Sequence, residues 1–101
     1  MFKLEPNPTF AVTVQITEPG GTTRPLNVVF RHKTRSVLLA WLDQKQSDLA
    51  MALDVVESIA ELPEGMTIKD FLEKLFEAYP ASALDLYLTY RRELLESRIK
   101  N

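Results

Sequence analysis

Apolar and polar residues alternate with a period of two in the first third of the chain. In residues 10–16, Phe10 and the branched side chains that follow it alternate with Ala, Thr and Gln. This period, with several β-branched residues, is typical of a half-buried strand. Two adjacent glycines, Gly20 and Gly21, follow, and alternation resumes over residues 26–32. Glycine supplies the positive φ that a chain reversal needs. The pattern therefore predicts an antiparallel hairpin over residues 9–32.

After the hairpin the apolar residues recur at helical spacing. The spacing predicts four helices, over residues 34–44, 47–60, 67–79 and 82–100. Each predicted helix begins at a residue whose hydroxyl can accept a hydrogen bond from the first turn: Thr34, Ser47, Thr67 and Ser82. Asp70 and Asp85, three residues after the last two, complete a weak form of the capping box.

A two-stranded hairpin is marginally stable in water, so its apolar face must be covered by the helices. We therefore predict an α+β fold, an N-terminal antiparallel β-hairpin followed by about four α-helices. The helical part spans residues 34–101, and a chain of 101 residues predicts a single compact domain over 1–101.

The amino-acid composition disfavours several classes of function. The chain has 12 basic and 14 acidic residues, a net charge of −2, which disfavours nucleic-acid binding. It has no cysteine, so disulfides and zinc–thiolate sites are excluded. No stretch reaches the ~20 apolar residues needed to cross a bilayer, and the N-terminus does not resemble a signal peptide. We expect a cytoplasmic protein that binds no membrane.

The residues that carry most enzyme chemistry are missing. A single histidine, His32, cannot form a cluster of imidazole ligands for a metal. No serine has a nucleophile-elbow sequence around it, and the glycines form no phosphate-binding motif. The glutamates fall on the polar faces of the predicted helices, where solvation accounts for them. We predict no enzyme, no catalytic residue, no metal and no cofactor.

Two features suggest partner binding. The basic run over residues 31–35 is either a solvated corner or a docking patch for an acidic segment. The last predicted helix has an apolar set formed by Leu84, Tyr87, Leu88, Leu94, Leu95 and Ile99. These side chains are either core or an exposed surface for a partner or for self-association. Tyrosine and arginine are favoured at interface hot spots. The candidate partner-binding residues are Trp41, Tyr87, Tyr90, Arg91 and Leu94.

Several segments together resemble a known family. The opening FKLEPNPTF leads into a valine-rich strand and a Pro-Gly-Gly turn, and VFRHKTR follows at residues 29–35. The C-terminal part carries Tyr-Pro-Ala at 79–81, then Tyr90, Leu94, Ser-Arg at 97–98 and Asn101. In this order, along the whole chain, the sequence resembles the small tail assembly chaperones of long-tailed phages and prophages.

The resemblance implies a non-catalytic binding protein in the bacterial host cytoplasm. It would hold the tape-measure protein while the tail tube polymerises, contact the major tail-tube protein in some phages, self-associate, and be absent from the mature virion. A competing hypothesis is a structural virion component, such as a tail completion or head–tail connector protein. A small DNA-binding regulator is a third, which the acidic balance disfavours.

Overall fold

The computed structural model describes residues 2–96. Its elements, in chain order, are β1 (Thr9–Thr17), β2 (Thr23–Arg31), α1 (Arg35–Leu42), α2 (Asp48–Val55), β3 (Val56–Ile59), α3 (Ile68–Ala78), α4 (Ser82–Arg91) and a π-helical turn (Arg92–Glu96). The predicted α+β class, with an N-terminal hairpin and four helices, is confirmed.

The hairpin forms as predicted. Pairing between β1 and β2 is antiparallel and unbroken from Thr9↔Arg31 to Thr17↔Thr23. Gly20 and Gly21, in the connecting turn, have φ values of 99° and 93°, a region that side chains with a Cβ rarely adopt. On one face the alternating apolar residues are buried or half-buried, while the opposite face is mostly exposed.

A third strand was not predicted. The helix expected over residues 47–60 ends at Val55, and β3 then pairs antiparallel with β2, in the sheet order β1-β2-β3. Register shifts between Val29 and Phe30, where the ladder has an irregularity. The prediction was wrong because the free edge of β2 offers hydrogen bonds to this segment, and pairing still buries Val56 and Ile59.

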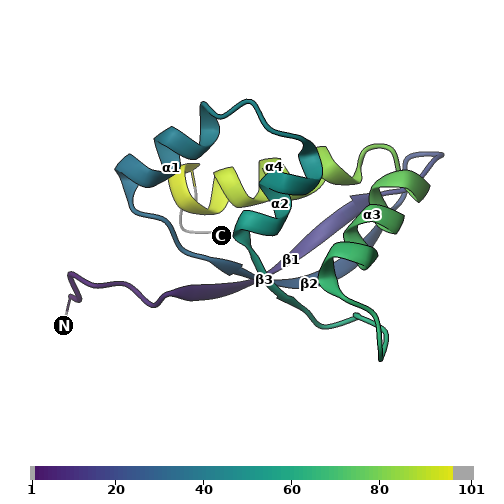
Figure 1. Cartoon of the computed structure of the whole chain (residues 1–101), viewed down its shortest axis with the longest axis horizontal. Helices are drawn as coiled ribbons and strands as arrows, with labels where there is room; N and C mark the ends of the chain where they lie inside the picture. Colours follow the sequence, from purple (N-terminus) through teal and green to yellow (C-terminus); the bar gives the residue numbers. More distant parts are fainter. Residues whose placement is uncertain (1, 97–101) are drawn as a thin grey trace.

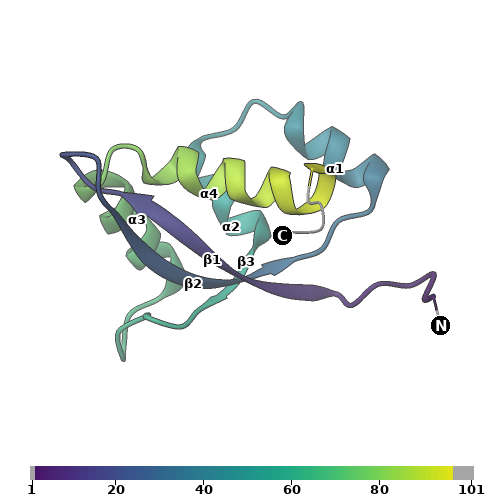
Figure 2. The ribbon, with the colours of Figure 1, turned by 180° about the vertical axis from the view of Figure 1, so that it is seen from behind.

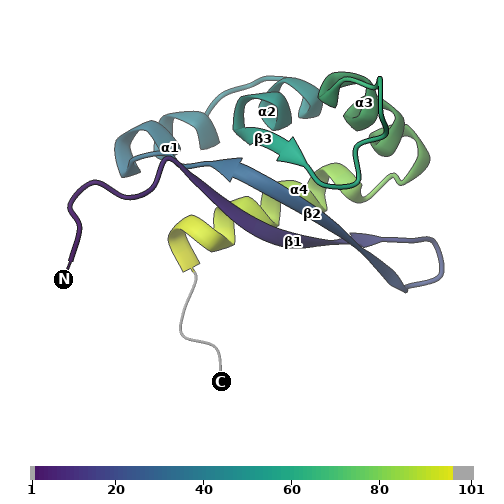
Figure 3. The same cartoon turned by 90° about the horizontal axis from the view of Figure 1, so that it is seen from below.

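All four helices lie on one side of the sheet, which leaves a two-layer arrangement with an open sheet face (Figures 1 and 2). Seen from below, the strands pass in front of α4, and the N-terminal lead extends away from the body (Figure 3). The core between the layers is formed by Val14, Ile16, Leu26, Val28, Phe30, Leu38, Trp41, Ala52, Val55, Val56, Ile59, Leu72, Leu86 and Tyr90. Within residues 2–96, no helix is long and apolar enough to cross a membrane.

Helix capping differs among the helices. The Ser47 hydroxyl accepts from the Ala50 backbone N–H at 3.1 Å, and the Thr67 hydroxyl accepts from that of Asp70 at 3.1 Å, as predicted. Thr34 stands at the N-cap of α1, but its side chain makes no capping hydrogen bond. The start of α1 therefore has no side-chain cap.

Ser82 and Asp85 do not form the predicted capping box. Ser82 is fully buried, and its hydroxyl donates to the Leu75 carbonyl at 3.2 Å, so it joins α4 to α3. The Asp85 carboxylate accepts from the Thr17 backbone N–H at 2.7 Å and from its hydroxyl at 3.1 Å. The two side chains serve tertiary contacts that position α4, and the sequence pattern could not distinguish these from a cap.

The buried face of α4 also differs from the predicted apolar set. Leu86 and Tyr90 point into the core, whereas Leu84 and Leu88 are exposed. The predicted continuous helix ends at Arg91 and gives way to the π-helical turn. Ile99, the last member of the predicted set, lies outside the described residues.

Candidate partner-binding groove

An aromatic cluster fixes α4 against the sheet. The ring of Tyr90 lies 5.1 Å from that of Phe30, 6.0 Å from that of Phe10 and 5.1 Å from that of Trp41. Its hydroxyl donates to the Arg31 carbonyl at 2.7 Å. Burial raises the pKa of the Tyr90 phenol well above its ordinary value, so the phenol stays a neutral donor. Tyr90 thus joins α4, β1, β2 and α1.

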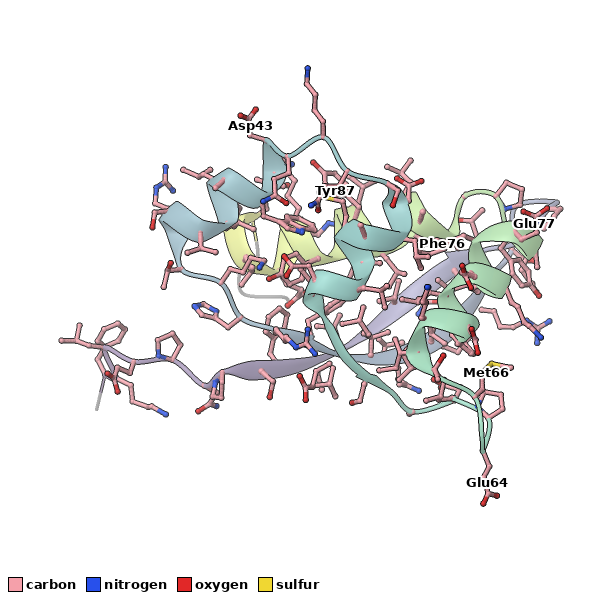
Figure 4. The ribbon with its side chains drawn as sticks, in the orientation of Figure 1. Asp43, Glu64, Met66, Phe76, Glu77 and Tyr87 are labelled. Atoms are coloured by element: carbon pink, nitrogen blue, oxygen red, sulfur yellow. The ribbon has the colours of Figure 1, made fainter. Side chains whose placement is uncertain are left out.

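Beside this cluster, a groove of about 370 Å³ opens between α4 on one side and α1 and α2 on the other. We call it the α1/α2/α4 groove. Trp41 and Tyr87 stack across it, with ring centroids 5.8 Å apart and an interplanar angle of 27°. Its apolar lining includes Trp41, Leu42, Met51, Ala52, Leu84 and Tyr87. The side chain of Tyr87 lies between α1 and α2 in the view of Figure 4.

Polar groups interrupt the apolar lining, among them the side-chain amide of Gln44. The Trp41 indole Nε1 is buried and has no hydrogen-bond partner within residues 2–96. An unsatisfied buried donor costs about 1–3 kcal/mol relative to a bonded one. Asp48, at the start of α2, is the one charged residue among the described residues that line the groove. The groove is therefore mostly apolar, with one amide side chain and one acidic residue in its lining and an unused hydrogen-bond donor on Trp41.

Large apolar side chains are exposed on the helices that border the groove. On α4, Leu84 is 56% and Leu88 is 39% exposed, and on α1 Val37 is 51% and Leu39 is 44% exposed. Scattered exposed leucines are common, but several on two neighbouring helices beside a groove indicate an interaction surface.

The model of one protein family, described as phage tail assembly chaperone, matches residues 1–101. The chain belongs to this family of phage tail assembly chaperones. No curated protein and no solved structure matches the chain. The family is non-catalytic, in agreement with the prediction that the chain is no enzyme.

The structure brings together two of the candidate partner-binding residues of the chaperone in the groove wall, where Trp41 is buried and Tyr87 is half-buried. Trp41 and Tyr87 stack there. Tyr90 also borders the groove but is 0% exposed, so a partner could reach it only by moving its neighbours. Arg91 pairs with Glu96 at 2.6 Å, and Leu94 packs against the core, both beyond the groove lining.

Sequence reasoning overlooked part of this surface of the chaperone. Leu84 and Leu88 belonged to the predicted apolar set, but no residue of α1 other than Trp41 was predicted to bind a partner, and Asp48 was not singled out. The six consecutive apolar residues 37–42 were the available signal, because an eight-residue helix cannot bury apolar residues on every side against one neighbour.

The basic run over residues 31–35 is partly neutralised within the chaperone. Arg31 pairs with Glu57 at 2.7 Å, and Lys33 pairs with Asp54 at 2.9 Å. These internal pairs disfavour a docking patch for an acidic segment, although the Lys33 side chain is only 12% exposed and is therefore not a solvated corner either.

Proposed function

We propose that this chaperone holds the tape-measure protein of its phage or prophage in the bacterial host cytoplasm until tail-tube subunits enclose it. Family membership over residues 1–101 carries the assembly role. The α1/α2/α4 groove and the exposed leucines beside it support the binding role, because a long helical client needs its apolar faces shielded before assembly.

The mode of action we propose is weak binding by many copies. Individually weak contacts add up along a long client, yet each copy can be displaced in turn by a polymerising tail-tube subunit. Self-association of the chaperone and contact with the major tail-tube protein belong to the same proposal. The chaperone would then leave the particle and be absent from the mature virion.

Genetics and particle composition test the proposal together. An early stop codon in this gene should give filled heads without tails after induction, seen by negative-stain microscopy. Supplying the protein from a plasmid should restore tails. Mass spectrometry of purified wild-type particles should then find none of it.

Two results would contradict the proposal in different ways. Normal infectious particles from the stop-codon strain would remove the assembly role. Stoichiometric protein in washed virions would instead support the competing hypothesis of a structural component such as a tail completion or head–tail connector protein.

A further inference from the structure

We infer that the α1/α2/α4 groove binds an amphipathic helix whose apolar face carries one neutral amide side chain, with a basic residue at its flank. The inference rests on the proposed function, since the helix is assigned to the tape-measure protein. It goes further by giving the site, the chemistry of the occupant and the residues that select it.

The apolar part of the occupant follows from the lining. Met51, Leu84 and Tyr87 present mostly carbon to the groove, and Leu84 is still 56% exposed in the free protein. Covering apolar surface is the main source of binding free energy for a helix in a groove.

The amide follows from Trp41. Its indole Nε1–H is buried and has no hydrogen-bond partner among residues 2–96, while the rest of the side chain is packed at 3% exposure. An acceptor from outside would satisfy this donor. Because Asp48 lies in the same groove, an acidic acceptor would be repelled and a neutral one is favoured. Among neutral acceptors, the side-chain carbonyl of asparagine or glutamine reaches a recessed donor further than the short hydroxyl of serine or threonine.

The basic flank also follows from Asp48. No salt bridge to Asp48 is formed within the described residues, and no second charged side chain among them lines the groove. A lysine or arginine of the occupant would complement it and set the direction in which the helix lies.

Binding must also move α1 slightly. Since Nε1 is closed off from solvent in the free protein, an acceptor reaches it only after a small displacement of the groove wall. The helix α1 has eight residues and no capping side-chain hydrogen bond, but Leu38 and Trp41 anchor it in the core, so the new hydrogen bond and the apolar contacts have to outweigh the cost of this displacement.

The experiment uses the full chain and overlapping peptides of the tape-measure protein from the same phage. Peptides of about 25 residues are long enough for a helix of roughly 37 Å. Trp41 is the sole tryptophan, so its emission reports directly on the groove. A bound peptide should change this emission and should contain an Asn or Gln within its apolar face.

Three variants separate the groove from the rest of the surface. Leu84→Ser should weaken peptide binding about tenfold, because part of a leucine side chain is no longer covered. Trp41→Phe, measured by calorimetry, should weaken it about three- to tenfold through loss of the donor. Leu4→Ser makes the same change at an exposed leucine in the N-terminal lead and should bind as wild type.

A double-mutant cycle isolates the hydrogen bond. Replacing the Asn or Gln of the bound peptide with leucine should weaken binding to wild type but have little further effect on Trp41→Phe. Additive losses would contradict a bond between the two groups.

The possible failures are distinguishable. If peptides bind but Leu84→Ser and Trp41→Phe bind as wild type, the groove inference is overturned and the proposed function stands. If neither a peptide nor the intact co-expressed tape-measure protein binds wild type, the proposed function fails. If Leu84→Ser changes sedimentation of the chaperone alone and leaves peptide binding intact, the occupant is a second copy, which also overturns the inference.

Discussion

The helices α1 and α3 are both short, yet they distribute their apolar residues in different ways. In α3 one face packs inward, with Leu72 fully buried, while its lysines and acidic residues are exposed. In α1 the apolar residues surround the helix, and only Leu38 and Trp41 are buried. A helix that is apolar on every side and incompletely covered is typical of an interface, whereas an amphipathic helix is complete within its own fold.

The helix starts show the same difference. Thr67 caps α3 with a side-chain hydrogen bond at 3.1 Å, and Thr34 makes no such bond to α1. The α3 side of the molecule is therefore stabilised by its own contacts. The α1 side keeps an apolar surface and an unused donor, which we assign to a partner.

The largest expected change in stability comes from replacing one leucine in α3, and the matching replacement in α1 tests the contrast between the two helices. Leu72→Ala should lower the free energy of unfolding by about 2–5 kcal/mol, because it leaves a cavity in the core. Leu39→Ala should change it by less than about 0.5 kcal/mol, as is usual for an exposed position. Urea unfolding followed by circular dichroism measures the free energy of unfolding of both variants. Equal losses of stability in the two would contradict the contrast between a complete α3 and an incompletely covered α1.

The next largest effect concerns Tyr90, which lies beneath the α1 side. Tyr90→Phe should lower stability by about 0.5–1.5 kcal/mol through loss of the hydrogen bond to the Arg31 carbonyl. Packing against Trp41 should survive, so near-UV circular dichroism should change little.

The same variant has a defined pH dependence. Burial raises the pKa of Tyr90 in the folded state, whereas the unfolded phenol ionises near its ordinary value of 10.0. The contribution of the Tyr90 hydroxyl to the free energy of unfolding is therefore fully present below about pH 10 and is lost as pH rises beyond it. Urea unfolding at about pH 9 and at about pH 11 measures this effect. The difference in free energy of unfolding between wild type and Tyr90→Phe should be smaller at the higher pH. A difference that stays the same at both pH values would contradict the burial of the Tyr90 phenol.

A smaller loss of stability is expected when the threonine at the start of α3 or α1 is replaced. Thr67→Ala should cost about 1 kcal/mol, since it removes a capping bond, while Thr34→Ala should cost close to nothing. Thermal melts of the two variants side by side give the comparison. A larger loss at Thr34 would show that α1 is capped in solution.

The smallest effect on stability is expected at the exposed face of α1. Val37→Ser should leave the melting temperature nearly unchanged, because the side chain is 51% exposed. It should nevertheless weaken capture of the tape-measure protein in a pull-down. Leu4→Ser, at a leucine that is 89% exposed, is the matched control and should capture normally.

The sequence allowed correct prediction where local pattern and tertiary packing agree. The hairpin and α3 have strong period-two and helical patterns with matching turn or cap residues, so both formed as predicted. Residues 56–59 fit a helical spacing too, but pairing with β2 decided their structure. That pairing joins segments that are nearly 30 residues apart in the sequence. The spacing of apolar residues within one segment carries no information about such a distant partner.

The candidate site was predicted in part for a related reason. Trp41 and Tyr87 were identified from residue type, and they do meet across the groove. Which face of α4 is buried depends on the contacts of Ser82 and Asp85 with distant segments. Tyr90 and Leu88 could therefore not be assigned to core or surface from the sequence.

Hydrogen exchange of the chaperone, alone and bound to the tape-measure protein, tests the central claim most directly. We predict slower exchange on binding in α1, α2 and α4, which form the groove, and unchanged exchange in α3. Protection confined to α3 or to the open face of the sheet, with α1 and α4 unchanged, would contradict the assignment of the α1 side to the partner.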